Sequence, residues 1–168
     1  MKCQTGSCVV WVAFVVLSTI FLSSQVVAQD YQALQGVSSV KAIFDIRSND
    51  PMNVYGHLHL IHKTFKEGTL READADPDFA VVFSDKSVLL LSQDREKYSE
   101  QERQILNKMD QTVSAMSQAG ITLEVCLFAL DYFDVDKNSV SEDINRVPNG
   151  WVSLIGYQAQ DYSLVPVY

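Results

Sequence analysis

The sequence predicts an α/β fold in which a mostly parallel sheet carries helices on both faces. Strand-like runs alternate with helical patterns along most of the chain, which is typical of right-handed βαβ units. The clearest example spans 120–134: a turn glycine, a short β-rich run, Cys126 and then a helical pattern. In open α/β sheets, ligands and chemistry gather at the carboxyl ends of the strands. Cys126 is therefore the first candidate for a functional residue.

The first half of the domain is predicted to run strand, helix, acidic loop. Residues 40–46 are β-rich and form the first predicted strand. Asp50 or Asn53 can cap the helix that follows, and that helix ends by Gly68. The loop at 69–78 is acidic. The apolar positions of the helix recur at i, i+4, i+7 and i+11, and they are Val54, Leu58, Ile61 and Phe65.

Two short apolar runs follow, at 79–83 and 87–91, separated by three polar residues. They are consistent with a hairpin, or with one strand followed by a short buried turn. Ser99 begins a Ser-Glu-Gln-Glu capping box, and the helix after it closes at Gly120. The apolar face of that helix contains Ile105, Leu106, Met109, Val113 and Met116.

The remainder of the chain is predicted to contain two more strands and two short helices. The segment between them, at 134–146, is acidic and irregular, with one helical turn expected near Glu142. The predicted elements are a strand at 121–125, a helix at 127–133, an amphipathic run at 152–157 and a last strand at 162–167.

The amino terminus has the pattern of a secretory signal peptide, residues 1–28. Lys2 precedes an apolar run at 9–22, and Val26-Val27-Ala28 place small residues before the expected cleavage site. The run is shorter than the ~20 residues that a membrane-spanning helix needs, so we expect cleavage, with an uncleaved anchor as the alternative. After cleavage, the mature chain is predicted to consist of a polar tail at 29–39 and one domain at 40–168. It is expected to have no stable membrane anchor. We expect a secreted, periplasmic protein.

Charge and cysteine content exclude several classes of function. Removal of the leader takes away one of 13 basic residues and no acidic ones, so 12 minus 21 gives a net charge of −9. This acidic balance argues against nucleic acid, because binding to it requires neutralisation of phosphates. Cys3 and Cys8 leave with the leader, so Cys126 is then the single cysteine and the core must stabilise the fold without a disulfide.

An ordered set of residues resembles the DsrE/DsrF-like family. The set comprises Gly120, Ile121, Leu123, Val125, Cys126, Val147-Pro148-Asn149-Gly150, Ile155, Gln158, Tyr162 and Pro166. The resemblance implies a three-layer α/β/α sandwich around a five-stranded parallel sheet, assembled into trimers or hexamers. It also implies sulfur relay, with Cys126 as the cysteine that carries sulfur as a persulfide. Two family glycines differ: Ser84-Asp85 replaces a histidine-glycine pair, and Asp161 precedes the final tyrosine.

The chemistry around Cys126 leaves two interpretations open. The first turn of a helix favours thiolate through the helix dipole. Strand alternation puts Glu124 and Cys126 on the same face of the strand, and the Glu124 carboxylate would oppose formation of a Cys126 thiolate. Because a glutamate is costly in a dry core, this face is expected to lie near solvent or inside a site. No histidine or lysine is close in sequence to act as a base, which fits a sulfur carrier or a binding protein better than a turnover enzyme. The alternative is a non-catalytic oligomeric module that binds a small ligand or a partner, with Cys126 buried as core.

Two metal patterns are weaker, so we predict no metal and no cofactor. His59 and His62 share one flank of a helix and could bind a metal, but no carboxylate accompanies them. Asp134, Asp136 and Asn138 resemble the start of a calcium loop, whose required glycine and glutamate are absent. The aromatic residues of the carboxyl-terminal third are expected in the core, at a subunit interface or in a pocket wall beside Cys126: Tyr132, Phe133, Trp151, Tyr157 and Tyr162. The expected partners are a second copy of the chain and a sulfur donor or acceptor protein.

Overall fold

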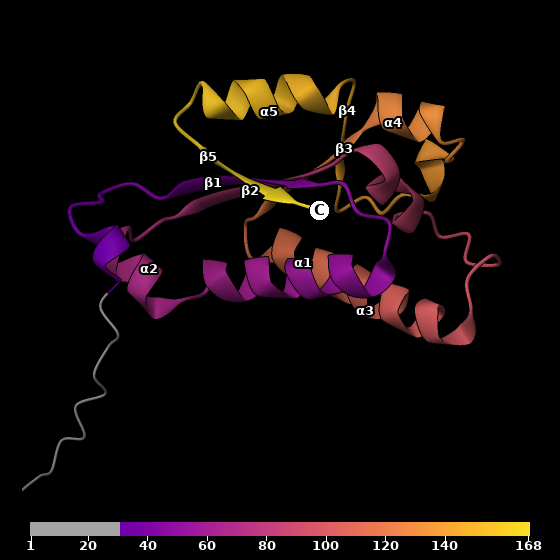
Figure 1. The fold of residues 1–168 in the computed structure, drawn as a ribbon, viewed down its shortest axis with the longest axis horizontal. Coiled ribbons are helices and arrows are strands. Elements are labelled where there is room, and N and C mark those ends of the chain that lie inside the picture. The colour runs from indigo at the N-terminus through magenta and orange to yellow at the C-terminus, as the bar shows by residue number, and fades with distance from the viewer. Residues whose placement is uncertain (1–30) are drawn as a thin grey trace, which may run out of the picture.

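The computed structural model describes residues 31–168, so the predicted signal peptide lies outside the described residues. Figure 1 shows a central sheet with helices above and below it. All neighbouring strands pair in parallel, in the order β4-β3-β2-β1-β5. The strands are β1 (Lys41–Ile46), β2 (Asp78–Phe83), β3 (Thr122–Cys126), β4 (Asn145–Val147) and β5 (Ser163–Val167).

The helices form the two outer layers and confirm the predicted three-layer α/β/α sandwich. In Figure 1, α1, α2 and α3 lie on one side of the sheet, and α4 and α5 lie on the other. No helix in the described part of the chain is long and apolar enough to cross a bilayer. The helices are α1 (Pro51–Phe65), α2 (Gly68–Ala73), α3 (Glu100–Gln118), α4 (Leu127–Tyr132) and α5 (Gly150–Gln158), with 3₁₀ turns η1 (Gln32–Leu34), η2 (Asp85–Leu90) and η3 (Lys137–Ser139).

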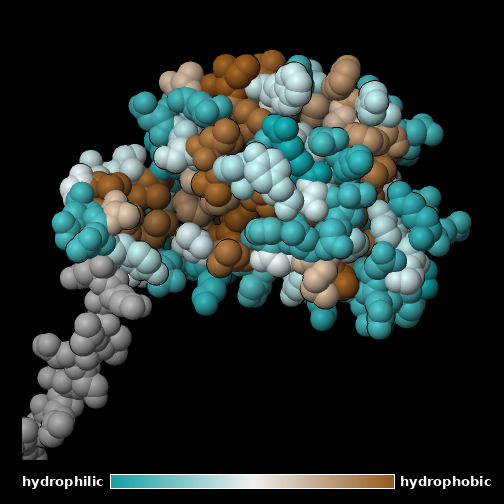
Figure 2. Space-filling view, in the orientation of Figure 1, coloured by the Kyte–Doolittle hydropathy of each residue, from teal (hydrophilic) through white to brown (hydrophobic). Residues whose placement is uncertain are grey.

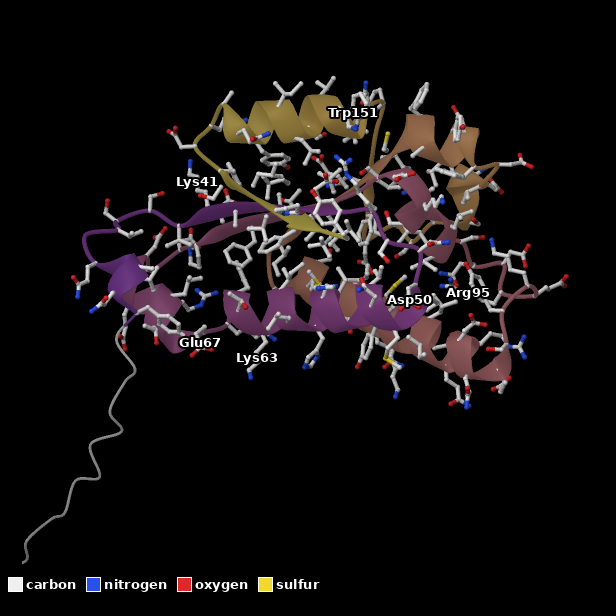
Figure 3. The ribbon with its side chains drawn as sticks, in the orientation of Figure 1. Lys41, Asp50, Lys63, Glu67, Arg95 and Trp151 are labelled. Carbon is white, nitrogen blue, oxygen red and sulfur yellow. The ribbon has the colours of Figure 1, made fainter. Side chains whose placement is uncertain are left out.

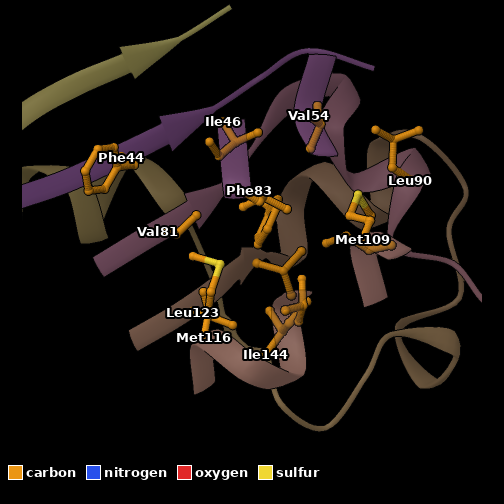
Figure 4. Packing of buried hydrophobic residues seen from close by; sticks show 14 of the residues in the cluster. Phe44, Ile46, Val54, Val81, Phe83, Leu90, Met109, Met116, Leu123 and Ile144 are labelled. Atoms are coloured by element: carbon orange, nitrogen blue, oxygen red, sulfur yellow. The ribbon is translucent and has the colours of Figure 1, made fainter. Parts of the chain in front are cut away.

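The main core lies between the sheet and the α1–α3 layer (Figure 4). The predicted apolar stripe of α1 is buried at all four positions, and in α3 only Ile105 of the predicted five is not buried. Asp50 caps α1 by accepting a hydrogen bond from the Asn53 amide at 2.6 Å. The Ser99 capping box is also present, with the Ser99 amide donating to Glu102 Oε2 at 2.8 Å. The hydrophobic period and the caps therefore account for both long helices.

Two local predictions need correction, and one open alternative is resolved. The loop at 69–78 begins with a short helix, α2, which has no buried residue and hence no apolar stripe to reveal it. The segment 134–146 contains strand β4, whose Asn145 and Arg146 are exposed, and its helical turn is η3 rather than a turn near Glu142. Pairing with β3, a tertiary contact, makes β4 a strand. After β2 the chain forms the second of the two predicted alternatives, the buried turn η2, in which Ser87 Oγ donates to Ile46 O at 2.8 Å.

The second face of the sheet is covered by α5 and has a smaller core of Ile43, Ala80, Val82, Leu154 and Tyr162. Gly150, the first residue of α5, lies directly against the sheet. A Cβ at that position would meet Cys126 Cβ and Val82 Cγ1, both at 3.1 Å. Glycine therefore allows the start of α5 to approach the end of β3, which brings the Asn149-Gly150 turn next to the cysteine.

Both sheet edges are short strands, and the β5 edge carries a proline. β5 and β4 have five and three residues respectively. Pro166 has no N–H, so it cannot donate a ladder hydrogen bond. Such edges are poor templates for pairing with another chain.

Gly150→Ala should destabilise the protein by about 1–3 kcal/mol, because the added methyl overpacks against Cys126 and Val82. Gly156→Ala, in the same helix, is the matched control. Its Cβ would meet nothing within 4 Å, so it should stabilise by about 0.5–1 kcal/mol through helix propensity. Urea unfolding of both variants checks this. Equal effects at the two positions would show that close approach at Gly150 is not limiting.

Candidate functional site

Cys126 lies where the sequence places it, as the last residue of β3 and the N-cap of α4. The side chain is buried, with 5% of its surface exposed. It is the one free cysteine among the described residues. Because Cys126 ends β3, it lies at the carboxyl edge of the sheet. The parallel neighbours β2 and β4 end at the same edge.

A pocket of about 380 Å³ opens beside Cys126. Residues from the ends of β1, β2 and β3, from α4 and from the start of α5 form its walls. Much of this wall is aromatic, and the polar side chains come mainly from the strand ends. The lining residues are Arg47, Ser84, Asp85, Cys126, Phe128, Ala129, Tyr132, Phe133, Asn149 and Trp151.

A buried carboxylate organises the polar side of the pocket. Asp45 is 3% exposed. Its Oδ1 accepts a hydrogen bond from Ser84 Oγ at 2.9 Å, and its Oδ2 accepts from Arg47 Nε at 2.7 Å and forms an ion pair with Nη2 at 2.7 Å. Hydrogen bonding to Asp45 raises the pKa of Arg47 above its usual value, against the opposing effect of burial. Asp45 thus links β1 to the end of β2 and fixes Arg47 in the pocket wall.

Arg47 and Asp85 are pocket residues that the sequence interpretation missed. That interpretation looked for a charged neighbour close to Cys126 in sequence, whereas Arg47 comes from the end of β1, two strands away. Asp45 and Arg47, both charged and flanking Ile46 at the end of a buried strand, were the available signal. Asp85 was noted only as a departure from a family glycine.

The backbone at Asp85 has a φ of 52°, in the left-handed region. Asp85 follows β2 directly and opens η2. Glycine adopts this conformation without steric cost, whereas a residue with a Cβ does so at a cost that aspartate bears better than most. The side chain is exposed and contributes a carboxylate to the pocket wall.

Glu124 is not among the residues that line the pocket. Its Oε1 accepts a hydrogen bond from the Tyr157 hydroxyl at 3.0 Å, while its Oε2 is buried with no hydrogen-bond partner within the described residues. Burial, and secondarily Glu124, raises the pKa of Tyr157. Glu124 therefore lies under α5, in contact with a tyrosine, rather than in the wall around the thiol.

The predicted aromatic residues divide between the pocket and the core. Tyr132, Phe133 and Trp151 line the pocket, together with Phe128. Figure 3 places Trp151 at the end of α5 that lies next to α4. Tyr157 and Tyr162 instead pack under α5, with ring centroids 4.8 Å apart.

The weaker metal patterns gain no third ligand. Among residues 31–168, no group of three or more His, Cys, Asp or Glu residues could hold a metal ion. Burial, followed by Lys66 and His59, lowers the pKa of His62. In the calcium-like loop, Asp136 caps η3 by accepting from the Asn138 amide at 2.9 Å. Asp136 therefore has a structural role in its loop, whereas His62 Nε2 is buried with no hydrogen-bond partner among the described residues.

Comparison with known proteins supports the same architecture. An uncharacterised protein of Aquifex aeolicus is 25% identical over 130 residues, which are 77% of this chain and 56% of the relative. The chain thus spans just over half the length of that relative. Two solved structures share the fold: the protein of unknown function MTH1491 from Methanobacterium thermoautotrophicum and the YchN protein from E. coli.

The two structures match most of both chains. MTH1491 has a TM-score of 0.58 at 17% identity, covering 76% of this chain and 99% of its own. YchN has a TM-score of 0.52 at 11% identity, and the match covers 76% of this chain and 98% of YchN. At the sequence level, the DsrE/DsrF-like family profile matches residues 41–167, which include every strand of the sheet and the pocket around Cys126. The chain therefore belongs to the DsrE/DsrF-like family.

Proposed function

We propose that this protein carries sulfane sulfur, with Cys126 as the thiol that holds it as a persulfide in sulfur relay or reduced-sulfur metabolism. The observation that carries the proposal is that Cys126 lines a pocket of about 380 Å³ at the carboxyl edge of the sheet. Membership of a sulfur-relay-type family supports the same chemistry. A buried core cysteine needs no such opening, whereas a carrier needs a path to its sulfur.

The transfer step requires only the thiolate and a donor. The Cys126 sulfur attacks the outer sulfur of a donor persulfide, R–S–SH, and a new S–S bond forms on Cys126 while the donor S–S bond breaks. The electron pair of the broken bond leaves on R–S⁻, and the proton of the transferred sulfur stays on it or passes to solvent. The reverse sequence delivers the sulfur to an acceptor thiol. This exchange needs an accessible thiolate and a leaving thiolate, with no cofactor.

The setting of this chemistry is also proposed. The leader pattern at 1–28 supports export to the periplasm, where a donor or acceptor protein would exchange sulfur with Cys126. An apolar patch on α4 and α5 supports assembly into a homo-oligomer, with a trimer or hexamer expected from the family resemblance. Figure 2 shows hydrophobic residues gathered over the α5 side of the molecule. The patch consists of the exposed side chains Phe128, Tyr132, Trp151, Val152 and Ile155.

The same patch favours a second candidate function. An oligomeric module that binds a partner or small ligand without chemistry would use the aromatic pocket wall and the patch. Cys126, at 5% exposure, would then be a small core residue. Reactivity of the thiol separates the two functions.

Incubation of the reduced protein with polysulfide should add whole sulfur atoms to Cys126. Intact mass spectrometry measures the gain, which a reducing agent should reverse. Cys126→Ser should show no gain and keep its melting temperature within a few degrees, because serine is close in size. A small alkylating agent should also label native Cys126 through the pocket. Labelling only after denaturation, with no sulfur gain, would favour the binding module and contradict the carrier.

Ile155→Lys should weaken self-association at least about tenfold, because it buries a charge in the proposed interface. Leu60→Lys is the control, since Leu60 is similarly exposed, at 57% against 66%, but lies on α1 in the opposite layer. Sedimentation velocity over a concentration series measures both. A monomeric wild-type protein, or equal loss of assembly in the two variants, would contradict an interface on α5.

A further inference from the structure

We infer that the pocket of Cys126 binds a small zwitterionic thiol of the α-amino-acid type, with its carboxylate on Arg47 and its ammonium on Asp85. Such a ligand places its sulfur, the remaining functional group, beside Cys126. The inference rests on the proposed sulfur-carrying function and names the class of donor or acceptor.

The wall of the Cys126 pocket presents two side chains of opposite charge, Arg47 and Asp85, together with Ser84. Arg47 does not need Asp85 for neutralisation, because the buried Asp45 already accepts from its Nε and pairs with its Nη2. Asp85 is thus an additional carboxylate. Counting Arg47, Asp45 and Asp85, the charged groups at the pocket sum to −1, which disfavours a purely anionic donor and favours a ligand that brings an ammonium group.

Arg47 retains donors for a ligand carboxylate. A guanidinium has five N–H groups, and Asp45 takes hydrogen bonds only on the Nε and Nη2 side. Nη1 makes no hydrogen bond to any other residue between 31 and 168, and the side chain is 38% exposed. The guanidinium is therefore held in place on one edge and open on the other, the arrangement in which arginine binds a carboxylate.

Asp85 keeps its carboxylate in the pocket at a backbone position that suits glycine, with φ at 52°. Among the described residues three aspartates have a positive φ, Asp85, Asp134 and Asp161, and of these only Asp85 lines the pocket. Asp85 caps no helix: as part of η2 its side chain makes no hydrogen bond to the described residues, unlike Asp50 and Asp136. The Asp85 carboxylate, whose charge also acts on Arg47, is therefore open to a ligand ammonium group.

Size and wall chemistry agree with this ligand. A volume of about 380 Å³ lies at the small end of ligand pockets, which span about 300–1,000 Å³. Tyr132 and Trp151 line the pocket. Aromatic faces attract an ammonium group through their π electrons, so these side chains suit a ligand that carries one. Phe128 and Ala129 supply apolar contacts for the short carbon chain and the sulfur.

Binding of unreactive analogues to the full mature chain tests the inference without sulfur transfer. S-methyl-L-cysteine carries both charges, 3-(methylthio)propionate lacks the ammonium, and 2-(methylthio)ethylamine lacks the carboxylate. NMR titration should show that S-methyl-L-cysteine binds at least about fivefold more tightly than either analogue, since each partly exposed charge contact contributes modestly. The perturbed amides should include those of Arg47, Asp85 and Cys126.

Variants at Asp85 locate the ammonium contact. Asp85→Asn keeps the shape and tolerates the left-handed backbone, so it should remove the preference for S-methyl-L-cysteine over 3-(methylthio)propionate without unfolding the protein. Asp85→Gly should remove the same preference while raising the melting temperature. Asp161→Asn is the matched control, because Asp161 also has a positive φ, 69°, but does not line the pocket; it should leave binding unchanged.

The outcomes separate this inference from the proposed function. If polysulfide loads Cys126 but S-methyl-L-cysteine binds no better than the singly charged analogues, the zwitterion site is wrong and the carrier stands. An unchanged preference in Asp85→Asn also overturns the site. If the preference is present and depends on Asp85 while Cys126 takes up no sulfur, the site stands and the carrier function fails.

Discussion

The buried carboxylate of Asp45 is the interaction on which the pocket depends. It accepts one hydrogen bond from Ser84 and pairs with Arg47, so a single 3%-exposed group sets the relative positions of the β1 and β2 ends. A buried charge is stable only when it is paired and hydrogen-bonded, and both conditions hold at Asp45. On the other side of the pocket, Gly150 lets α5 contact Cys126 directly. The Asp45–Arg47 ion pair thus fixes the polar wall of the pocket, and Gly150, which has no Cβ, allows α5 to pack against Cys126.

The order of strands and helices could be predicted because hydrophobic period and capping residues are local signals. The α1 stripe and the Ser99 box both appear in the structure as expected. Strand β4 could not be predicted, because three residues with two exposed side chains become a strand only through pairing with β3. Arg47 was missed for a related reason: its proximity to Cys126 is created by the strand order β3-β2-β1 and not by any nearby sequence.

The two departures from the family pattern have one physical explanation. Asp85 and Asp161 stand where the sequence resemblance implies glycine, and both have positive φ values, 52° and 69°. Aspartate is among the few residues that adopt this conformation routinely, so the backbone path is kept and the fold is unchanged. What differs is the chemistry: at 161 the new carboxylate lies away from the pocket, whereas at 85 it becomes part of the pocket wall. Of the two positions, only Asp85 is therefore placed to contact a bound ligand.

The depth of Cys126 also sets the size of what can reach it. Only 5% of the residue is exposed, and it lines a pocket whose wall is largely aromatic. Two folded copies cannot bring their Cys126 sulfurs within the length of an S–S bond, about 2.05 Å, without moving those walls. A pocket of about 380 Å³ suits a small thiol or a narrow extended segment better than a folded domain.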